Sequence, residues 1–184
     1  MMAGLLAVVM IMTCVVGGSL AWLTAKSDPV VNTFTVGDIN IKLEESKDLD
    51  LKMVPGNKLD KDPVFTVIEG SEPCYVFLQV TEDNNLDDFI SYNLNANWKQ
   101  LNTVVTGAPA NIYYQEDINA ANAEKKLEVL AGNQVSVLES VTKAMMKTAK
   151  ELPPKLSFQA AAVQDANLNL TQAWAEAKTL LGVA

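Results

Sequence analysis

Apolar and polar side chains alternate along much of this chain, and this period of two limits the possible folds more than any other feature. The alternation is strict over residues 39–44, which is typical of a strand with one face on a core and the other in water. Residues 75–80 are apolar at all but one position, which predicts a strand buried on both faces at the centre of a sheet. The pattern therefore predicts a mainly β fold.

Further strands are predicted where short apolar or β-branched runs lie between turn residues. Gly, Pro, Asn and Ser mark the turns, because these residues either tolerate a positive φ or favour tight bends. The predicted strands cover residues 64–68, 112–115, 127–130, 134–138 and 155–163.

Two helices are predicted within this series of strands. Residues 141–150 are rich in good helix formers, and Pro153-Pro154 ends that helix before the last strand. Thr171 is a predicted N-cap for a helix through Leu181, with Trp174 on an apolar stripe that packs on the sheet. Short strands joined by a crossover helix predict a β-sandwich of jelly-roll type, followed by a C-terminal helix.

The first twenty-three residues carry no charge, and small residues follow this apolar run. Ser19 and Ala21 form the small-x-small pair that a signal peptidase reads, so we expect an apolar signal helix that is cleaved between Ala21 and Trp22. An uncleaved membrane anchor is the alternative, because the run is long enough to span a bilayer. The run lacks an initial positive charge, which leaves a start upstream of Met1 open. Secretion to the extracellular matrix or cell surface of a bacterium is the expected location.

The expected organisation has three parts. Residues 1–21 are the signal peptide, residues 22–36 are an extended N-terminal segment, and residues 37–184 are one β-sandwich domain. Cys74 is the only cysteine after the leader, so no disulfide forms within the mature chain. Because its neighbours are apolar, we expect a buried and inert thiol.

Composition argues against several function classes. The net charge is −8, and all fourteen cationic residues are Lys, whereas nucleic-acid binding needs clustered cations and favours Arg. The chain has no histidine, which removes the usual general base, the usual zinc ligand and every Ser-His or Cys-His nucleophile. No HExxH, GxSxG or phosphate-binding glycine motif is present. We therefore expect a protein that is not an enzyme and that has no catalytic residue and no cofactor.

One acidic loop, residues 82–88, is a weak candidate for a calcium site. Its side chains Asp83, Asp87 and Asp88 offer the oxygen ligands that calcium prefers. The spacing lacks the order of an EF-hand, and Asn85 suits the cap of a short turn instead. A solvated loop without metal is the favoured interpretation.

Six short motifs follow one another along the chain. They follow the leader end Gly17-Gly18-Ser19-Leu20-Ala21-Trp22-Leu23-Thr24, and they are Asn32-Thr33-Phe34-Thr35-Val36-Gly37, Met53-Val54-Pro55-Gly56, Lys61-Asp62-Pro63, Gly70-Ser71-Glu72-Pro73-Cys74, Val141-Thr142-Lys143-Ala144-Met145-Met146 and Ala162-Val163-Gln164. In this order the chain resembles SipW-dependent members of the TasA/camelysin family. The resemblance implies processing by a SipW-type signal peptidase and a secreted jelly-roll subunit of biofilm matrix or cell-surface fibres.

The same resemblance implies assembly by donor strand, in which the N-terminal segment of one subunit completes the sheet of the next. Residues 22–36 have the composition of a strand, and the expected polymerisation residues are Val30, Val31, Phe34 and Val36. The residues alone leave two alternatives open, a first strand that folds back on its own subunit and a frayed tail.

Other functions follow from the same observations. A monomeric or membrane-anchored surface module for binding or adhesion is the main alternative. Camelysin relatives also suggest a metallopeptidase, but without histidine the chain has no recognisable way to hold a catalytic zinc. The expected partners are copies of this chain or a related fibre subunit. The sequence leaves open whether it is a major or a minor subunit, and the register of a donated strand.

Overall fold

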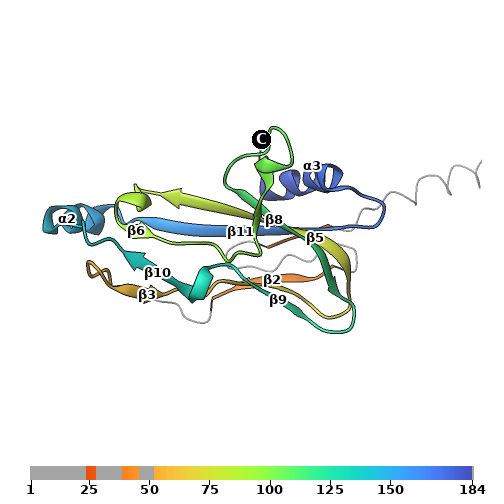
Figure 1. Ribbon diagram of the computed structural model, residues 1–184, viewed down its shortest axis with the longest axis horizontal. Coiled ribbons are helices and arrows are strands. Elements are labelled where there is room, and N and C mark those ends of the chain that lie inside the picture. The colour runs from red at the N-terminus through yellow and green to blue at the C-terminus, as the bar shows by residue number, and fades with distance from the viewer. Residues whose placement is uncertain (1–23, 28–38, 46–51, 184) are drawn as a thin grey trace, which may run out of the picture.

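The computed structural model describes residues 24–27, 39–45 and 52–183. Within this part the chain is mainly β, with antiparallel pairing between all neighbouring strands. Figure 1 shows two layers of strands, with α2 at one end and α3 on the outer face of one layer. The predicted signal helix lies outside the described residues.

The larger sheet contains the strand that the sequence places at its centre. Its order is β1-β11-β5-β8-β7, so β5 lies in the middle and the prediction is confirmed. β5 and β11 pair over ten residues, from Lys155 opposite Asp83 to Gln164 opposite Cys74. The strands of this sheet are β1 (Thr24–Ser27), β5 (Ser71–Asp83), β7 (Lys99–Gln100), β8 (Ile112–Ala120) and β11 (Lys155–Gln164).

The second layer consists of two three-stranded sheets with the orders β3-β10-β6 and β2-β4-β9. Several of these strands are very short, and the alternation of side chains in β3, β6 and β7 is too brief to be found in the sequence. The strands are β2 (Ile41–Glu44), β3 (Lys58–Asp60), β4 (Val64–Val67), β6 (Ile90–Ser91), β9 (Lys125–Glu128) and β10 (Gln134–Val137).

The main core lies between the two layers. Phe65 and Val67 of β4 are fully buried there, beside Val76 and Leu78 of β5. The face of β4 that carries Phe65 and Val67 is therefore its core face. A second, smaller cluster lies between the larger sheet and α3.

Capping residues set where the helices begin. In α2 (Lys143–Glu151) the Thr142 side chain accepts a bond from the Met145 amide, and in α3 (Leu170–Leu181) the Asn169 side chain accepts one from the Gln172 amide. The prediction of Thr171 as the second cap is therefore wrong by two positions. Short 3₁₀ turns occur at η1 (Leu86–Asp88), η2 (Leu101–Thr103) and η3 (Ala131–Asn133).

None of the helices in the described part has the length and apolar composition needed to cross a bilayer.

Candidate assembly site: one edge of the larger sheet

The first strand of the described chain pairs with the last. β1 runs antiparallel to β11, with Thr24 opposite Val163 and Ser27 opposite Ala160. Part of the segment that the sequence predicts to be donated therefore lies on β11 of its own chain. This arrangement matches the alternative in which the segment folds back as a first strand.

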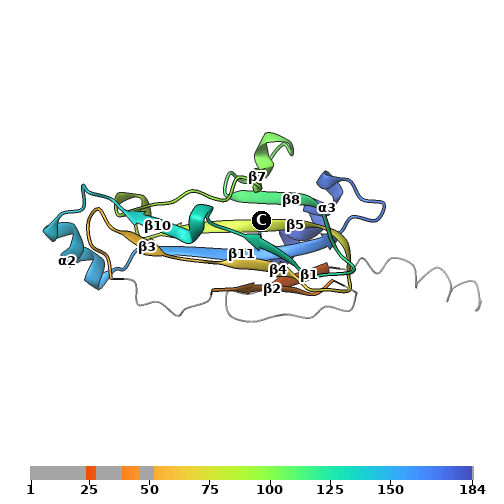
Figure 2. The ribbon, with the colours of Figure 1, turned by 60° about the horizontal axis from the view of Figure 1, so that its bottom comes forward.

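β1 is the outermost strand of the larger sheet, and it lies in a groove between other elements. α3 contacts β1 and β11 from one side, and β2 contacts both strands from the other. Figure 2 shows β1 beside β2, at the margin of the larger sheet. A strand at this position is therefore enclosed on both of its faces as well as hydrogen-bonded along one side.

The floor of this groove is a run of small side chains on β11. Ala160, Ala161, Ala162 and Val163 all have 0% exposure. Ala161 and Val163 belong to the cluster under α3, whereas Ala160 and Ala162 belong to the core between the layers. Alternate residues of a strand face opposite sides, so both faces of β11 are buried here. Small residues let the helix and the opposite sheet approach the strand closely.

α3 is held over the groove by a buried aromatic contact. The ring centroids of Trp174 and Phe77 are 5.7 Å apart at an interplanar angle of 45°. Ala173, Ala177 and Leu181 complete the buried stripe of the helix, which confirms that this stripe packs on the domain's own sheet. The apolar stripe in the sequence of α3 therefore explains why this helix forms one wall of the groove.

Beyond β1, the edge of β11 has no further strand partner among the described residues. Residues 155–159 of β11 pair with β5 on one side only within that part. A cavity of about 410 Å³ lies next to them, between β11 and the second layer. Its lining is largely apolar and includes Met53, Leu59, Leu86, Ile90, Val135 and Leu156.

Lys61 lies at the margin of this cavity. Its Nζ lies 5.7 Å from the centroid of the Phe158 ring, and it donates to Glu45 Oε1 at 2.5 Å. A cation over a ring face is attracted by the ring quadrupole. The lysine stem and Phe158 therefore close one side of the core next to the unpaired part of β11.

Cys74 is buried on β5, next to the end of the β11 pairing. Burial raises the pKa of its thiol to about 12, with a further contribution from the negative charge of Asp165. A thiol with so high a pKa is almost entirely protonated at neutral pH, and the thiolate is the reactive form. The arrangement agrees with the inert thiol that its apolar neighbours predict.

The calcium candidates lie around one turn at the end of β5. Asp83 ends that strand, and Asp87 and Asp88 lie in η1. No group of three potential metal ligands is found in the described part of the chain. Asn85 precedes η1 in a left-handed conformation with φ 55°, and its side chain makes no capping bond. Calcium binding here stays a prediction without a geometric argument in its favour.

The remaining predicted site residues lie outside the described residues. These are the cleavage positions Ala21 and Trp22 and the polymerisation residues Val30, Val31, Phe34 and Val36. The groove itself was not predicted as a site. The run Ala160-Ala161-Ala162-Val163 was the available signal, because a strand of such small residues suggests close approach by neighbours on both faces.

Comparison of the chain with protein-family models, with curated proteins and with solved structures finds no match.

Proposed function

We propose that this protein is a secreted structural subunit, and not an enzyme, that polymerises by exchange of its N-terminal strand into fibres of a bacterial biofilm matrix or cell surface. The proposed fold is a jelly-roll sandwich, and the proposed partner is a second copy of the chain or a related subunit. The observation that carries the proposal is the short strand β1 enclosed between α3 and β2.

Strand exchange is plausible because the closed and exchanged arrangements offer the same contacts. The groove accepts Thr24–Ser27 of its own chain, so it accepts the same residues from a neighbour equally well. Domain swapping of this kind is a low-cost route to assembly. The balance then depends on the strain of the connecting segment and on protein concentration.

The closed strand is also weakly held compared with the rest of the sheet. β1 pairs over four residues, whereas β11 and β5 pair over ten. Each backbone hydrogen bond contributes about 0.5–1.5 kcal/mol net, so about four bonds hold β1 by about 2–6 kcal/mol. Opening of β1 alone therefore costs less than the roughly 5–15 kcal/mol that global unfolding needs. Exchange therefore does not require unfolding of the domain.

The unpaired part of β11 extends the acceptor edge. A donated strand that continued past Ser27 in the register of β1 would place residues 28–32 alongside residues 159–155 of the acceptor. That stretch includes the predicted polymerisation residues Val30 and Val31, and it reaches the apolar cavity beside Leu156. A longer donated strand would bury more apolar surface than the four pairs of β1 and would favour the fibre.

A disulfide that locks β1 onto its own β11 tests this proposal. Ala25 and Ala162 are directly opposite in the register, so Ala25→Cys with Ala162→Cys, in a Cys74→Ala background, fixes the closed form. We expect the oxidised mature chain, residues 22–184, to stay monomeric by size-exclusion chromatography and negative-stain microscopy. Reduction should restore filaments.

The matched control is a disulfide that leaves the groove free. Val64→Cys with Glu128→Cys joins β4 to β9, which are opposite in the other layer, and this variant should form filaments when oxidised. If the locked variant polymerises as well as the control, the strand does not exchange. If the unmodified mature chain stays monomeric over a range of pH and salt, the surface-module alternative is favoured instead.

A further inference from the structure

Three adjoining hollows on the described surface share one tyrosine. Hollows of about 430 and 510 Å³ both contact Glu82, Tyr92 and Tyr113, and a third of about 230 Å³ contacts Tyr92 and Asn93. We call this continuous depression the Tyr92 groove. It lies over the ends of β5 and β8, over β6, and beside β10, and it does not involve β1 or α3.

The two tyrosines give the groove fixed ring surfaces. Tyr92 and Tyr113 are half-buried and pack against the main core, so each ring has one side held by the protein and another available at the surface. Aromatic rings held in this way offer an apolar face together with a hydroxyl group. Little conformational entropy remains to be lost when a ligand packs on them.

Polar side chains surround these rings. Tyr92 donates its hydroxyl hydrogen to Glu82 Oε1. Burial and this hydrogen bond raise the pKa of Tyr92, so the hydroxyl stays protonated at neutral pH. Asn93, Gln134 and Ser136 add amide and hydroxyl groups at the other end. Such side chains both donate and accept hydrogen bonds.

The backbone along the groove is already hydrogen-bonded. Val80 donates its amide to Asn111 O at 3.0 Å, and Asn111 Nδ2 donates to Val80 O at 2.9 Å. Ser136 and Val137 of β10 pair with the two residues of β6. These bonds already occupy Val80 and the inner side of β6, whereas the other side of β6 is an edge of its sheet. The ligand argued for here is recognised by side chains.

The charge of the groove also restricts its ligand. Glu82 and Asp87 contribute carboxylates to the middle of the groove, and Lys58 lines only the smallest hollow. Carboxylates repel an anionic polymer. They accept hydrogen bonds from hydroxyl groups, so a neutral polyhydroxylated ligand suits the site better.

We propose that the Tyr92 groove binds an extended chain of neutral sugar residues. A sugar ring has an apolar face of C–H groups that packs on a tyrosine ring, and its hydroxyls bond to carboxylate and amide groups. The two larger hollows have the volume typical of small-molecule sites, and the three together suit consecutive sugar units. This proposal does not require strand exchange, because the lining of the groove includes no residue of β1 or α3. The groove and the apolar cavity beside β11 share Ile90 in their linings.

Isothermal titration calorimetry with three hexasaccharides tests the inference. The mature chain, locked as a monomer by the Ala25–Ala162 disulfide, is titrated with cellohexaose, xylohexaose and chitohexaose, and with polygalacturonate as an anionic polymer. We expect at least one neutral hexasaccharide to bind and polygalacturonate not to bind. Tyr92→Ala should weaken that binding by about tenfold or more.

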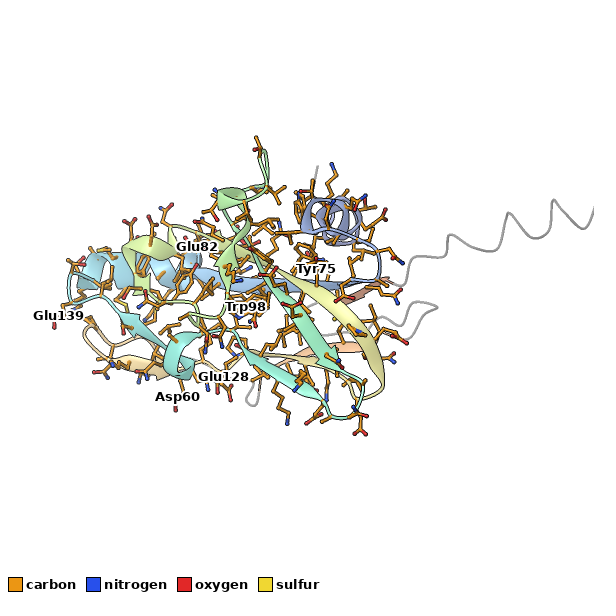
Figure 3. The ribbon with its side chains drawn as sticks, turned by 45° about the vertical axis from the view of Figure 1, so that its right-hand side comes forward. Asp60, Tyr75, Glu82, Trp98, Glu128 and Glu139 are labelled. Carbon is orange, nitrogen blue, oxygen red and sulfur yellow. The ribbon has the colours of Figure 1, made fainter. Side chains whose placement is uncertain are left out.

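The control replaces a tyrosine far from the groove. Tyr75 is half-buried beside α3 and donates its hydroxyl to Leu168 O at 3.4 Å. Figure 3 shows it well apart from Glu82. Tyr75→Ala should leave sugar affinity unchanged. Asn93→Ala changes an exposed side chain and tests the site if Tyr92→Ala does not fold.

Three outcomes would overturn the inference. The first is that none of the three neutral hexasaccharides binds. The second is that binding survives unchanged in Asn93→Ala and in Tyr92→Ala, or in the first alone if the second does not fold. The third is that polygalacturonate binds more tightly than the neutral sugars.

Discussion

The two edges of the larger sheet are protected in different ways. At one edge, β7 has only two residues, and its exposed Lys99 forms a 2.6 Å ion pair with Glu116 of β8. At the other edge, β11 carries four buried small residues and is covered by β1. Charged and very short edge strands prevent pairing with other chains, whereas an apolar edge must be covered by a strand. Of these two edges in the described part of the chain, the β11 edge is the one that suits a further strand, and it is the edge that the proposed exchange uses.

The largest expected loss of stability comes from weakening α3, which forms one wall of the groove that holds β1. Trp174→Ala should destabilise the domain by about 3–5 kcal/mol, because it leaves a cavity between α3 and the larger sheet. The loss of the contact with Phe77 should also loosen α3 over β1. We expect the urea midpoint to fall and the closed strand to open more often, as measured by faster amide hydrogen exchange in β1.

Trp98→Ala is the matched control for this variant. Trp98 is as deeply buried as Trp174, but it packs edge-on against Phe65 between the layers and donates its Nε1 hydrogen to Glu128 O at 2.9 Å. Trp98 directly precedes β7, which lies at the opposite edge of the larger sheet from β1. We expect a similar loss of stability without selective exchange in β1. Equal acceleration of β1 exchange in both variants would contradict a specific role for α3.

The buried thiol of Cys74 makes the stability of the domain depend on pH, and this dependence can be measured. Burial raises the pKa of Cys74 in the folded chain to about 12, from the ordinary thiol value of 9.0. The unfolded thiol ionises at a lower pH than the folded one. The folded state therefore loses stability as the pH rises above about 9. From pH 8 to pH 10, we expect the free energy of unfolding to fall by about 1 kcal/mol more in the parent chain than in Cys74→Ala.

Urea denaturation at the two pH values measures this difference, and thiol labelling gives an independent check. The native thiol should resist iodoacetamide at pH 8 and react after unfolding, because only the thiolate attacks. Rapid labelling of the native chain would show that β5 is exposed near Cys74 and that the groove region opens readily. Cys74→Ala removes the titrating group and changes little of the packing volume.

The sequence predicts strands whose side chains enter the core, both the long β11 and the four-residue β4 and β10, but it finds less than half of β8. The central position of β5 follows from its continuous apolar run, and β11 from its length and its Ala-rich face. Such runs reflect burial on both sides. The shortest strands form because a neighbouring strand pairs with them, β10 for β3 and β6 and β8 for β7. Their own two or three residues contain too little signal.

The candidate groove was harder to predict, because it depends on elements far apart in the chain. β1 and β11 are separated by more than a hundred residues, and only the fold brings Thr24–Ser27 to the small side chains of Ala160–Val163. The Thr171 cap failed for a local reason. Asn169 and Gln172 complete a reciprocal capping box two positions earlier, and that pair satisfies two backbone amides.

The smallest effect on stability is expected at the charged edge. Lys99 and Glu116 are exposed, and the hydrogen bond to Glu116 raises the pKa of Lys99. Such pairs add little to stability, so Lys99→Val with Glu116→Val should leave the urea midpoint unchanged. We expect the change to appear in association instead, because an apolar edge without charges pairs with other chains.

The locked monomer isolates this effect. With the Ala25–Ala162 disulfide closed, any new association of the double variant must come from the β7 edge rather than from strand exchange. We expect sedimentation velocity to show dimers or larger species that the locked parent lacks. A locked double variant that stays monomeric would show that the charges are dispensable. The brevity of β7, with only two residues paired to β8, would then be what keeps this edge from accepting a strand.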